Sequence, residues 1–201
     1  MSDSLARARL ARAAARFGQP ALPSLVLVTD DERLPDPLAA ANALPRGSAV
    51  LVRARDAARR ADLSRAMLKL ARRKGLTILI ADDPELAMKL GADGLHLPEA
   101  RMREAAHWRA RYPALMITAA AHSFSAILQA RLMPIDAIFL SPVFATRSHP
   151  GGPALTALRA NNLAHAAGKP VYALGGIDAR NARLLSREAF SGIAAIGALR
   201  M

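Results

Sequence analysis

The feature that most limits the possible folds is a regular alternation of short apolar stretches with longer segments of helical spacing. The apolar stretches are residues 25–29, 49–53, 76–80, 93–97, 115–119, 135–140, 170–177 and 192–198. Strands that alternate with helices imply right-handed crossovers and a parallel sheet. Eight such units predict a closed α/β fold, the (β/α)8 TIM barrel.

An open, doubly wound sheet is the alternative architecture. The count of eight stretches favours the barrel, as does the lack of a Gly-x-Gly-x-x-Gly sequence after the first stretch. We therefore expect one compact barrel domain over residues 1–201, with a helix-like segment at 178–189 joining the last two strands.

The eighth helix of a standard barrel has little room in this sequence. The last apolar stretch ends at residue 198 of 201, so most of that helix is expected to be missing. Such barrels typically have about 250 residues, which also makes this one small. The N-terminal region 1–20 contains a helical pattern at 5–17 that is expected to pack on the barrel. Either this helix or a partner subunit in a homodimer is expected to cover the gap.

The charge of the chain favours small anionic ligands over nucleic acid. The net charge is +12, but the arginines are scattered, aromatic residues make up only 4%, and no nucleic-acid recognition motif is present. No apolar run is long enough to span a membrane. The absence of cysteine excludes disulfides and thiolate metal sites and fits a reducing compartment. We expect a cytoplasmic protein without nucleic-acid or membrane partners.

Two glycine-containing junctions are candidate phosphate sites. The seventh stretch stops at Gly175 and Gly176, and the eighth stops at Gly197 and Ala198. Free backbone amides at strand-to-helix junctions favour anions, and barrel phosphate sites usually follow strands seven and eight. A plain turn between a strand and a helix is the structural alternative for Gly175 and Gly176.

Other candidate residues follow the remaining strands, where barrel active sites form. Arg53 and Arg55 offer planar donors suited to phosphate oxygens, and His122 is suited to proton transfer near neutral pH. The long loop after the sixth stretch contributes three polar residues, Thr146, Ser148 and His149. Asp82 is a weak candidate for a metal ligand.

Structural roles remain open for several of these residues. Asp30 and Asp82 are each also candidates for helix N-caps. Arg55 and His149 could be solvated residues without a role in binding. His96 lies inside an apolar stretch, where a hydrogen-bonded structural histidine is the commoner case.

Several motifs in one order resemble the thiamine phosphate synthase superfamily, including its thiazole tautomerase (TenI-like) branch. The resemblance covers roughly residues 25–198. It rests on Val-Thr-Asp at 28–30, Val-Arg-Ala-Arg at 52–55, Gly-Ala-Asp-Gly-Leu-His-Leu at 91–97, His122, Ser-Pro-Val-Phe-Ala-Thr at 141–146, Ala-Leu-Gly-Gly-Ile at 173–177 and Gly-Ile-Ala-Ala-Ile at 192–196.

The chain departs from the synthase pattern on the pyrophosphate and metal side. Arg53 is retained, whereas Leu51 and Arg55 stand where the synthase pattern has Gln and Lys. Only Asp82 remains of the implied metal carboxylates, because Arg101 occupies the second position. The synthase's Ser-x-His after strand five reads Ala-Ala-His at 120–122, and its Thr-x-Thr-Lys reads Thr-Arg-Ser-His at 146–149.

The resemblance therefore implies a protein of thiamine biosynthesis that binds a phosphorylated thiazole. The expected activity is that of a thiazole tautomerase with His122 as acid and base, since His122-Ser123 and Leu97-Pro98 are similar to that branch. The alternatives are a thiamine phosphate synthase, which would use Mg²⁺, and a non-catalytic barrel that binds phosphorylated metabolites.

Overall fold

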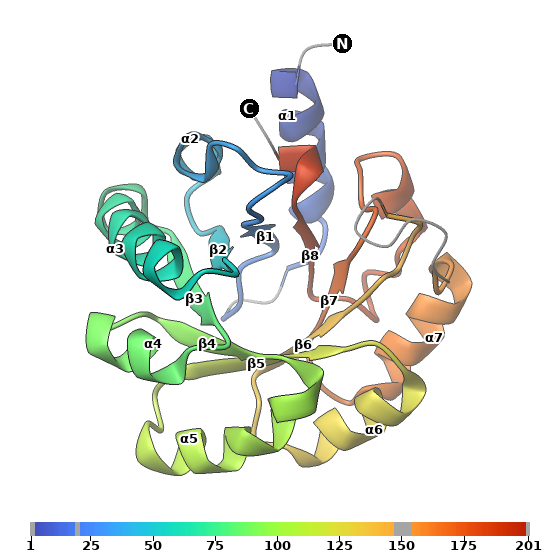
Figure 1. Cartoon of the computed structure of the whole chain (residues 1–201). Coiled ribbons are helices and arrows are strands. Elements are labelled where there is room, and N and C mark those ends of the chain that lie inside the picture. Colours follow the sequence, from blue (N-terminus) through green and yellow to red (C-terminus); the bar gives the residue numbers. More distant parts are fainter. Residues whose placement is uncertain (1–2, 19–20, 147–153, 200–201) are drawn as a thin grey trace.

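The chain forms a closed barrel of eight parallel strands, as the sequence predicts. This computed structural model describes residues 3–18, 21–146 and 154–199. Each strand pairs with its neighbours in sequence order, and β1 closes the barrel by pairing with β8, where Leu25 lies beside Ile193. Figure 1 shows the strands at the centre, with the helices arranged around them.

The strands are β1 (Leu25–Val28), β2 (Ala49–Val52), β3 (Thr77–Ala81), β4 (Gly94–Leu97), β5 (Met116–Ala121), β6 (Ala137–Leu140), β7 (Val171–Leu174) and β8 (Gly192–Ala195). The α-helices are α1 (Asp3–Ala14), α2 (Pro37–Asn42), α3 (Ala57–Lys74), α4 (Pro84–Leu90), α5 (Ala105–Arg111), α6 (Phe124–Leu132) and α7 (Ala157–Ala166). The 3-10 helices are η1 (Glu99–Glu104), η2 (Asn181–Leu184) and η3 (Gly197–Leu199).

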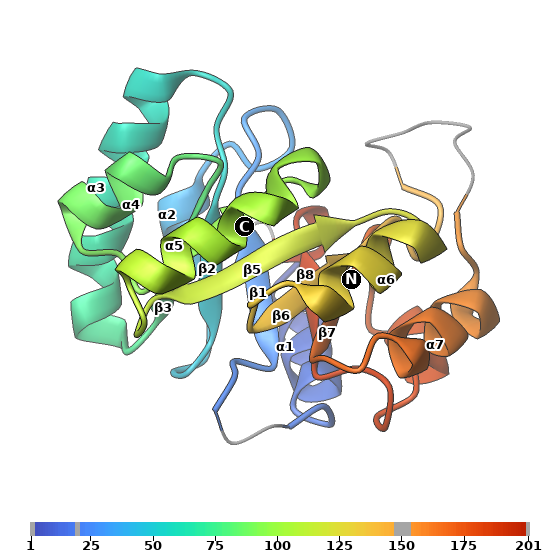
Figure 2. The same ribbon diagram turned by 90° about the horizontal axis from the view of Figure 1, so that it is seen from below.

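Local sequence signals set where several helices begin and end. The side chains of Asp56 and Asp83 accept hydrogen bonds from the backbone of the first turns of α3 and α4. Gly75 and Gly91 end the same helices in the left-handed conformation that glycine favours. Helices α4, α5 and α6 follow one another around the outside of the barrel (Figure 2).

Apolar side chains pack in two layers, because successive residues of a strand point to opposite faces of the sheet. One layer fills the barrel interior with side chains that include Val26, Leu51, Leu79, Phe139 and Tyr172. The other lies between the strands and the surrounding helices. None of the described helices is both long and apolar enough to cross a membrane.

The N-terminal helix α1 packs on the outside of the barrel beside β8. It contacts η2 and η3, and Leu10, Ala14 and Phe17 are fully buried there. Figure 1 shows α1 next to β8, on the side where an eighth helix would otherwise lie. In the described part of the chain, the single turn η3 follows β8.

The segment at 178–189 differs from the helix expected there. Only four of its residues are helical, in the 3-10 turn η2. The Asp178 carboxylate accepts hydrogen bonds from the amides of Arg180 and Asn181, and the Asn181 amide group donates to the carbonyl of Gly176. These side-chain bonds hold the backbone in a turn and compete with an α-helix.

Candidate functional site

The carboxyl ends of the strands meet at one end of the barrel, which we call the mouth. Thr29, buried after β1, ties the first two strand ends together there. Its hydroxyl donates to the carbonyl oxygen of Arg53 at 2.8 Å and accepts from the Arg53 amide at 2.7 Å. This exchange fixes the backbone from which the Arg53 side chain projects.

Two arginines hold the Asp30 carboxylate at the mouth. Arg33 donates to it from Nε and Nη2, at 3.1 and 2.6 Å, and Arg53 donates from Nη1 at 3.2 Å. The hydrogen bonds from the Arg33 side chain are the largest cause that lowers the Asp30 pKa to about 2. Arg53 keeps half of its side chain exposed, so its remaining donors are available to an anionic ligand.

The side chain of Arg55 is more exposed than that of Arg53. Its guanidinium pairs with Glu32 at 2.9 Å, and both side chains are largely exposed. Its backbone amide donates to the carboxylate of Asp31 at 2.9 Å. Of the two arginines expected to bind phosphate, Arg53 therefore has the more sheltered position.

His96 points into the barrel and is held there as a neutral ring. Its Nδ1 lies 2.9 Å from the hydroxyl of Thr118, and its ring meets Phe139 edge-on at 4.9 Å between centroids. Burial lowers the His96 pKa to about 3, with smaller contributions from the charges of His122 and Arg53. The structure thus supports the alternative of a hydrogen-bonded structural histidine.

His122 projects from the end of β5 into solvent at the mouth. Its backbone amide donates to Oε2 of Glu99 at 2.7 Å, and its Nδ1 lies 2.9 Å from the carbonyl oxygen of Ser141. A carbonyl oxygen only accepts, so this contact requires the hydrogen to be on Nδ1, and in the neutral imidazole the lone pair is then on Nε2. No described residue hydrogen bonds to Nε2, which can therefore exchange a proton with a ligand.

Glu99 and Ser141 were not among the residues expected in the site. Glu99 follows β4 and Ser141 follows β6, and each contacts His122, which follows the strand between them, β5. The Ser141 hydroxyl is also 3.1 Å from Nδ1 of His122. Their positions directly after apolar stretches were the available signal, because the ends of adjacent parallel strands lie side by side.

Gly175 and Gly176 allow two loops to meet closely at the mouth. Both have positive φ values, +97° and +63°. A Cβ on Gly176 would collide with the carbonyl oxygen of Ala145, and one on Gly175 would lie 2.9 Å from Cα of Pro142. Their backbone amides have no hydrogen-bond partner among the described residues. The pair therefore has a packing role and also leaves two donors available for an anion.

The other residues expected to bind phosphate are placed less tightly. Gly197 and Ala198 lie in η3 after β8, and a Cβ on Gly197 would meet nothing within 4 Å. Ala198 lines a groove between α1 and the loop after β7. Thr146 is half-buried at the end of a described segment, and Ser148 and His149 lie outside the described residues.

Asp82 is bound by an arginine. Its carboxylate accepts from Nη1 of Arg101 at 2.5 Å, and its backbone has a positive φ of 55°. Arg101 also forms a bidentate pair with Glu104, with both distances 2.7 Å. The hydrogen bonds to Glu104 are the largest cause that raises the Arg101 pKa, and the same contact lowers the pKa of Glu104. Asp83, rather than Asp82, caps the following helix.

These residues do not fit a magnesium site. Mg²⁺ prefers several oxygen ligands in octahedral geometry, and Asp82 is a single carboxylate already paired with a guanidinium. Among residues 3–18, 21–146 and 154–199, no group of three His, Asp or Glu side chains could hold a metal ion.

The fold and the mouth define a class: a small (β/α)8 barrel with a histidine and an arginine where the strands end. The chain belongs to the thiamine monophosphate synthase/TenI family, and the family described as "Thiamine monophosphate synthase" matches residues 25–199. This finding confirms the superfamily indicated by the sequence motifs. It does not distinguish the TenI branch from the synthases.

Similar proteins carry the synthase name. A thiamine-phosphate synthase of Thermus thermophilus is 40% identical over 124 residues, which cover 59% of this chain and 57% of that protein. The match thus spans little more than half the length of that relative. A thiamine-phosphate synthase of Chlorobium phaeovibrioides is 30% identical over 184 residues and covers 90% of this chain and 88% of that protein.

A solved structure has the same fold. Thiamine phosphate pyrophosphorylase from Pyrococcus furiosus superimposes with a TM-score of 0.73 at 22% identity, covering 91% of this chain and 87% of that one. At this identity the likeness supports the barrel architecture and not the chemistry.

Proposed function

We propose that the mouth binds a phosphorylated thiazole of thiamine biosynthesis and that His122 transfers a proton on it, as in a thiazole tautomerase. The observation that carries this proposal is the arrangement of His122. Its Nδ1 is fixed by the carbonyl of Ser141, and its Nε2 is free of partners within the described segments. This is the geometry of a group that accepts and returns a single proton.

The phosphate of the ligand would be bound by neutral and charged donors at the mouth. The amides of Gly175 and Gly176 are unpaired within the described segments, and Arg53 supplies a fixed positive charge. Backbone amides combined with a guanidinium favour a dianionic group strongly. His96 stays neutral, and its ring packs against Phe139 and hydrogen bonds with Thr118.

The proton transfer needs only one group of suitable basicity. Nε2 of His122 would remove a proton from a ring carbon of the non-aromatic thiazole and return it to a side-chain carbon. The ring then becomes aromatic without any oxidation or leaving group. Such a reaction requires no metal ion, which agrees with the poor fit of the Asp82 region to Mg²⁺.

Ultraviolet absorbance would follow this reaction directly, because the ring becomes aromatic. Purified protein would be given the non-aromatic thiazole carboxylate phosphate tautomer. We expect the protein to accelerate the change and His122→Ala to reduce the rate by about 100-fold or more. His165→Ala, on the exposed face of α7, serves as the matched control and should retain the parent rate. A His122→Ala variant as fast as the parent would rule out the assignment.

Thiamine phosphate synthase is the second candidate, and the comparisons favour it over the tautomerase. The relatives at 40% and 30% identity are both named thiamine-phosphate synthases. This activity would join hydroxymethylpyrimidine pyrophosphate to thiazole phosphate. Incubation of both substrates with Mg²⁺ and detection of thiamine phosphate tests it, and no product above background would exclude it.

A non-catalytic phosphate-binding barrel is the outcome if both assays fail. Calorimetry with thiazole phosphate distinguishes this case from loss of the ligand site. Tight binding without turnover would retain the anion site and remove the catalytic role of His122. Absence of binding would reject the assignment of the mouth itself.

A further inference from the structure

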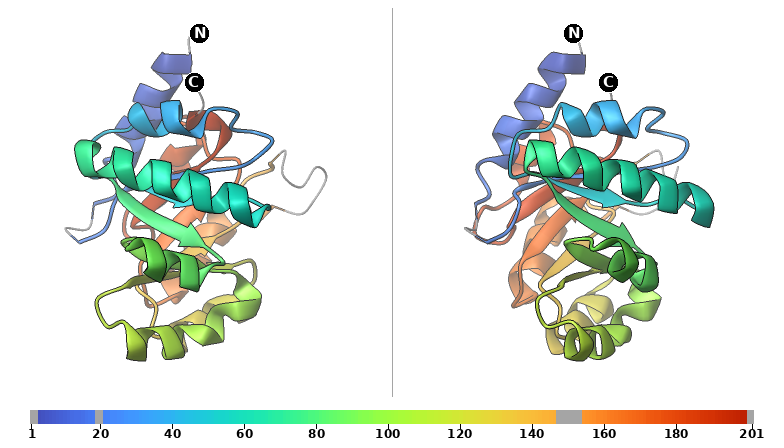
Figure 3. Two further views of the ribbon diagram at one scale, coloured as in Figure 1. Left: turned by 60° about the vertical axis from the view of Figure 1, so that its left-hand side comes forward. Right: turned by 90° about the vertical axis from the view of Figure 1, so that its left-hand side faces the viewer.

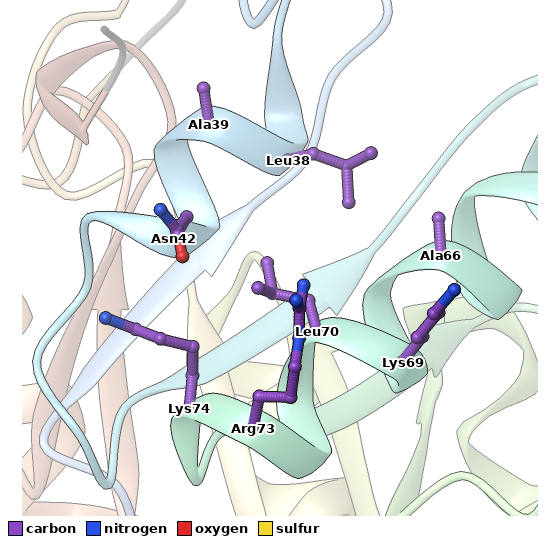
Figure 4. Close-up of a pocket in the computed structure, with 8 residues that line it drawn as sticks. All are labelled: Leu38, Ala39, Asn42, Ala66, Lys69, Leu70, Arg73 and Lys74. Carbon is purple, nitrogen blue, oxygen red and sulfur yellow. The ribbon is translucent and has the colours of Figure 1, made fainter.

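A groove on the outer surface combines an apolar floor with basic side chains. It lies between α2 and α3 and has a volume of about 690 Å³. Figure 4 shows the groove with its lining side chains, and Figure 3 shows α2 and α3 side by side on the outside of the barrel. The lining residues are Leu38, Ala39, Asn42, Ala66, Lys69, Leu70, Arg73 and Lys74.

The groove is remote from the mouth. Helix α3 starts at Ala57, after the carboxyl end of β2, and runs back to Lys74, before the amino end of β3. The three cations of the groove lie in the last two turns of α3. They therefore lie toward the end of the barrel opposite the mouth, and a ligand bound there would not touch His122.

The charges on α3 are distributed unevenly. In its first half, Arg59, Arg60 and Arg65 each pair with a carboxylate, at 3.1, 3.0 and 2.7 Å. Within the described part of the chain, the cations of the groove have no such partner. The groove also contains no acidic residue among its lining side chains. The second half of α3 thus leaves three positive charges unmatched.

Stabilisation of the C-terminal end of α3 explains part of the positive charge in its last turns. Cations near the C-terminus of a helix interact favourably with its dipole, and Arg72 supplies the same effect from an exposed position outside the groove. The dipole does not account for the apolar floor that accompanies Lys69, Arg73 and Lys74. Leu38 is 38% exposed at this floor, beside Ala39 and Ala66.

The separation between the three cations indicates how the negative charges of a ligand should be spaced. Lys69 and Arg73 are four residues apart, which corresponds to a rise of about 6 Å along the helix. In Figure 4 their side chains and that of Lys74 extend in different directions and do not converge on one point. A single phosphate group would not meet all three. A chain with several separated carboxylates and an apolar side chain would meet the cations and the floor together.

We propose that the groove between α2 and α3 binds an acidic peptide segment of a partner protein, with one large apolar side chain seated against Leu38 and Leu70. The basic side chains then pair with the flanking carboxylates of the peptide. Each partner supplies what the other lacks: the groove has an apolar floor with unmatched cations, and the peptide has an apolar side chain with carboxylates.

Fluorescence anisotropy with a labelled model peptide tests this proposal on the full chain. The probe peptide has glutamates flanking a central Leu-Leu pair. We expect saturable binding that weakens as salt is added, because the exposed ion pairs are screened. Arg73→Glu should weaken binding by at least about tenfold. Arg72→Glu makes the same charge change one residue away and should weaken it by less than about twofold.

Two further probes identify the occupant. A peptide with Gly-Gly in place of Leu-Leu should bind at least about tenfold more weakly, because it lacks the apolar side chain, and equal binding of the two peptides would overturn the apolar contact. Equal weakening by Arg72→Glu and Arg73→Glu would overturn the groove, since binding would then follow the net charge alone. Tighter binding of a single-stranded oligonucleotide at this groove would overturn the peptide as its ligand. Thermal melting of each variant checks that the barrel is intact.

Discussion

The guanidinium of Arg101 lies 2.5 Å from the carboxylate of Asp82 and joins the loop after β3 to the segment after β4. Arg101 is itself held in place by two hydrogen bonds that it donates to the carboxylate of Glu104. The carboxylate is therefore neutralised by a side chain of the protein. A divalent cation would have to displace this arginine before it could bind Asp82.

The first prediction is that ligand binding at the mouth does not depend on Mg²⁺. Calorimetry with thiazole phosphate should give a Kd that changes by less than about twofold between magnesium-containing and chelator-treated buffer. Arg101→Ala removes the competing guanidinium and should make Asp82 accessible to the ion. A parent protein whose affinity rises strongly with Mg²⁺ would contradict this account of Asp82.

The second prediction concerns the glycine that follows β7. Gly176→Ala should lower the free energy of unfolding by about 1–3 kcal/mol, because the residue has positive φ and its Cβ would collide with Ala145. Gly197→Ala is the matched control, since nothing lies within 4 Å of its Cβ position and its φ is not positive. It should stay within about 0.5 kcal/mol of the parent. Urea unfolding of both variants provides the comparison.

The third prediction is a dependence of stability on pH through His96. The folded-state pKa is about 3, against an ordinary value of 6.5. Between these values the unfolded chain binds a proton that the folded chain does not, so stability falls as the pH falls through this window. Urea unfolding should show a loss of up to about 1.4 kcal/mol per pH unit, which His96→Gln should reduce. An unchanged slope in the variant would contradict the burial of a neutral ring.

The fourth prediction concerns Glu99 as a positioning residue. Its carboxylate accepts from the backbone amide of His122, so Glu99→Ala should loosen the start of the segment that holds the imidazole. We expect kcat for the proposed proton transfer to fall by about tenfold, with the Kd for thiazole phosphate unchanged. A parallel change in both constants would indicate a general disturbance of the mouth. Glu188→Ala, in an exposed loop, is the control.

The fold was predictable because its main signal is repeated along the whole chain. Each of the eight apolar stretches overlaps one observed strand, although β3 and β5 extend one and two residues beyond the predicted ends, and the alternation with helices predicts the parallel closure. The segment after β7 was predicted wrongly as helical. The conformation of this segment depends on hydrogen bonds between Asp178, Asn181 and Gly176. The spacing of hydrophobic residues does not show such bonds between side chains and the backbone.

The site was only partly predictable, because position along a strand does not give the direction or the partner of a side chain. His122 and Arg53 could be identified from their place after buried strands, and both lie at the mouth. The pairing of Arg55 with Glu32 depends on how two loops meet, as does the contact of Glu99 with His122. Neither the Arg55–Glu32 pair nor the Glu99–His122 contact can be predicted from position in the sequence alone.

The close contact of Gly176 with Ala145 also has an evolutionary consequence. Every single-nucleotide change that alters a glycine codon to another amino acid introduces a Cβ, and at this position the space is filled by the backbone of the neighbouring loop. A substitution there therefore requires a compensating shift in the loop after β6. The position of Gly176 and the path of the loop after β6 are thus coupled, and we expect the two loops to diverge together.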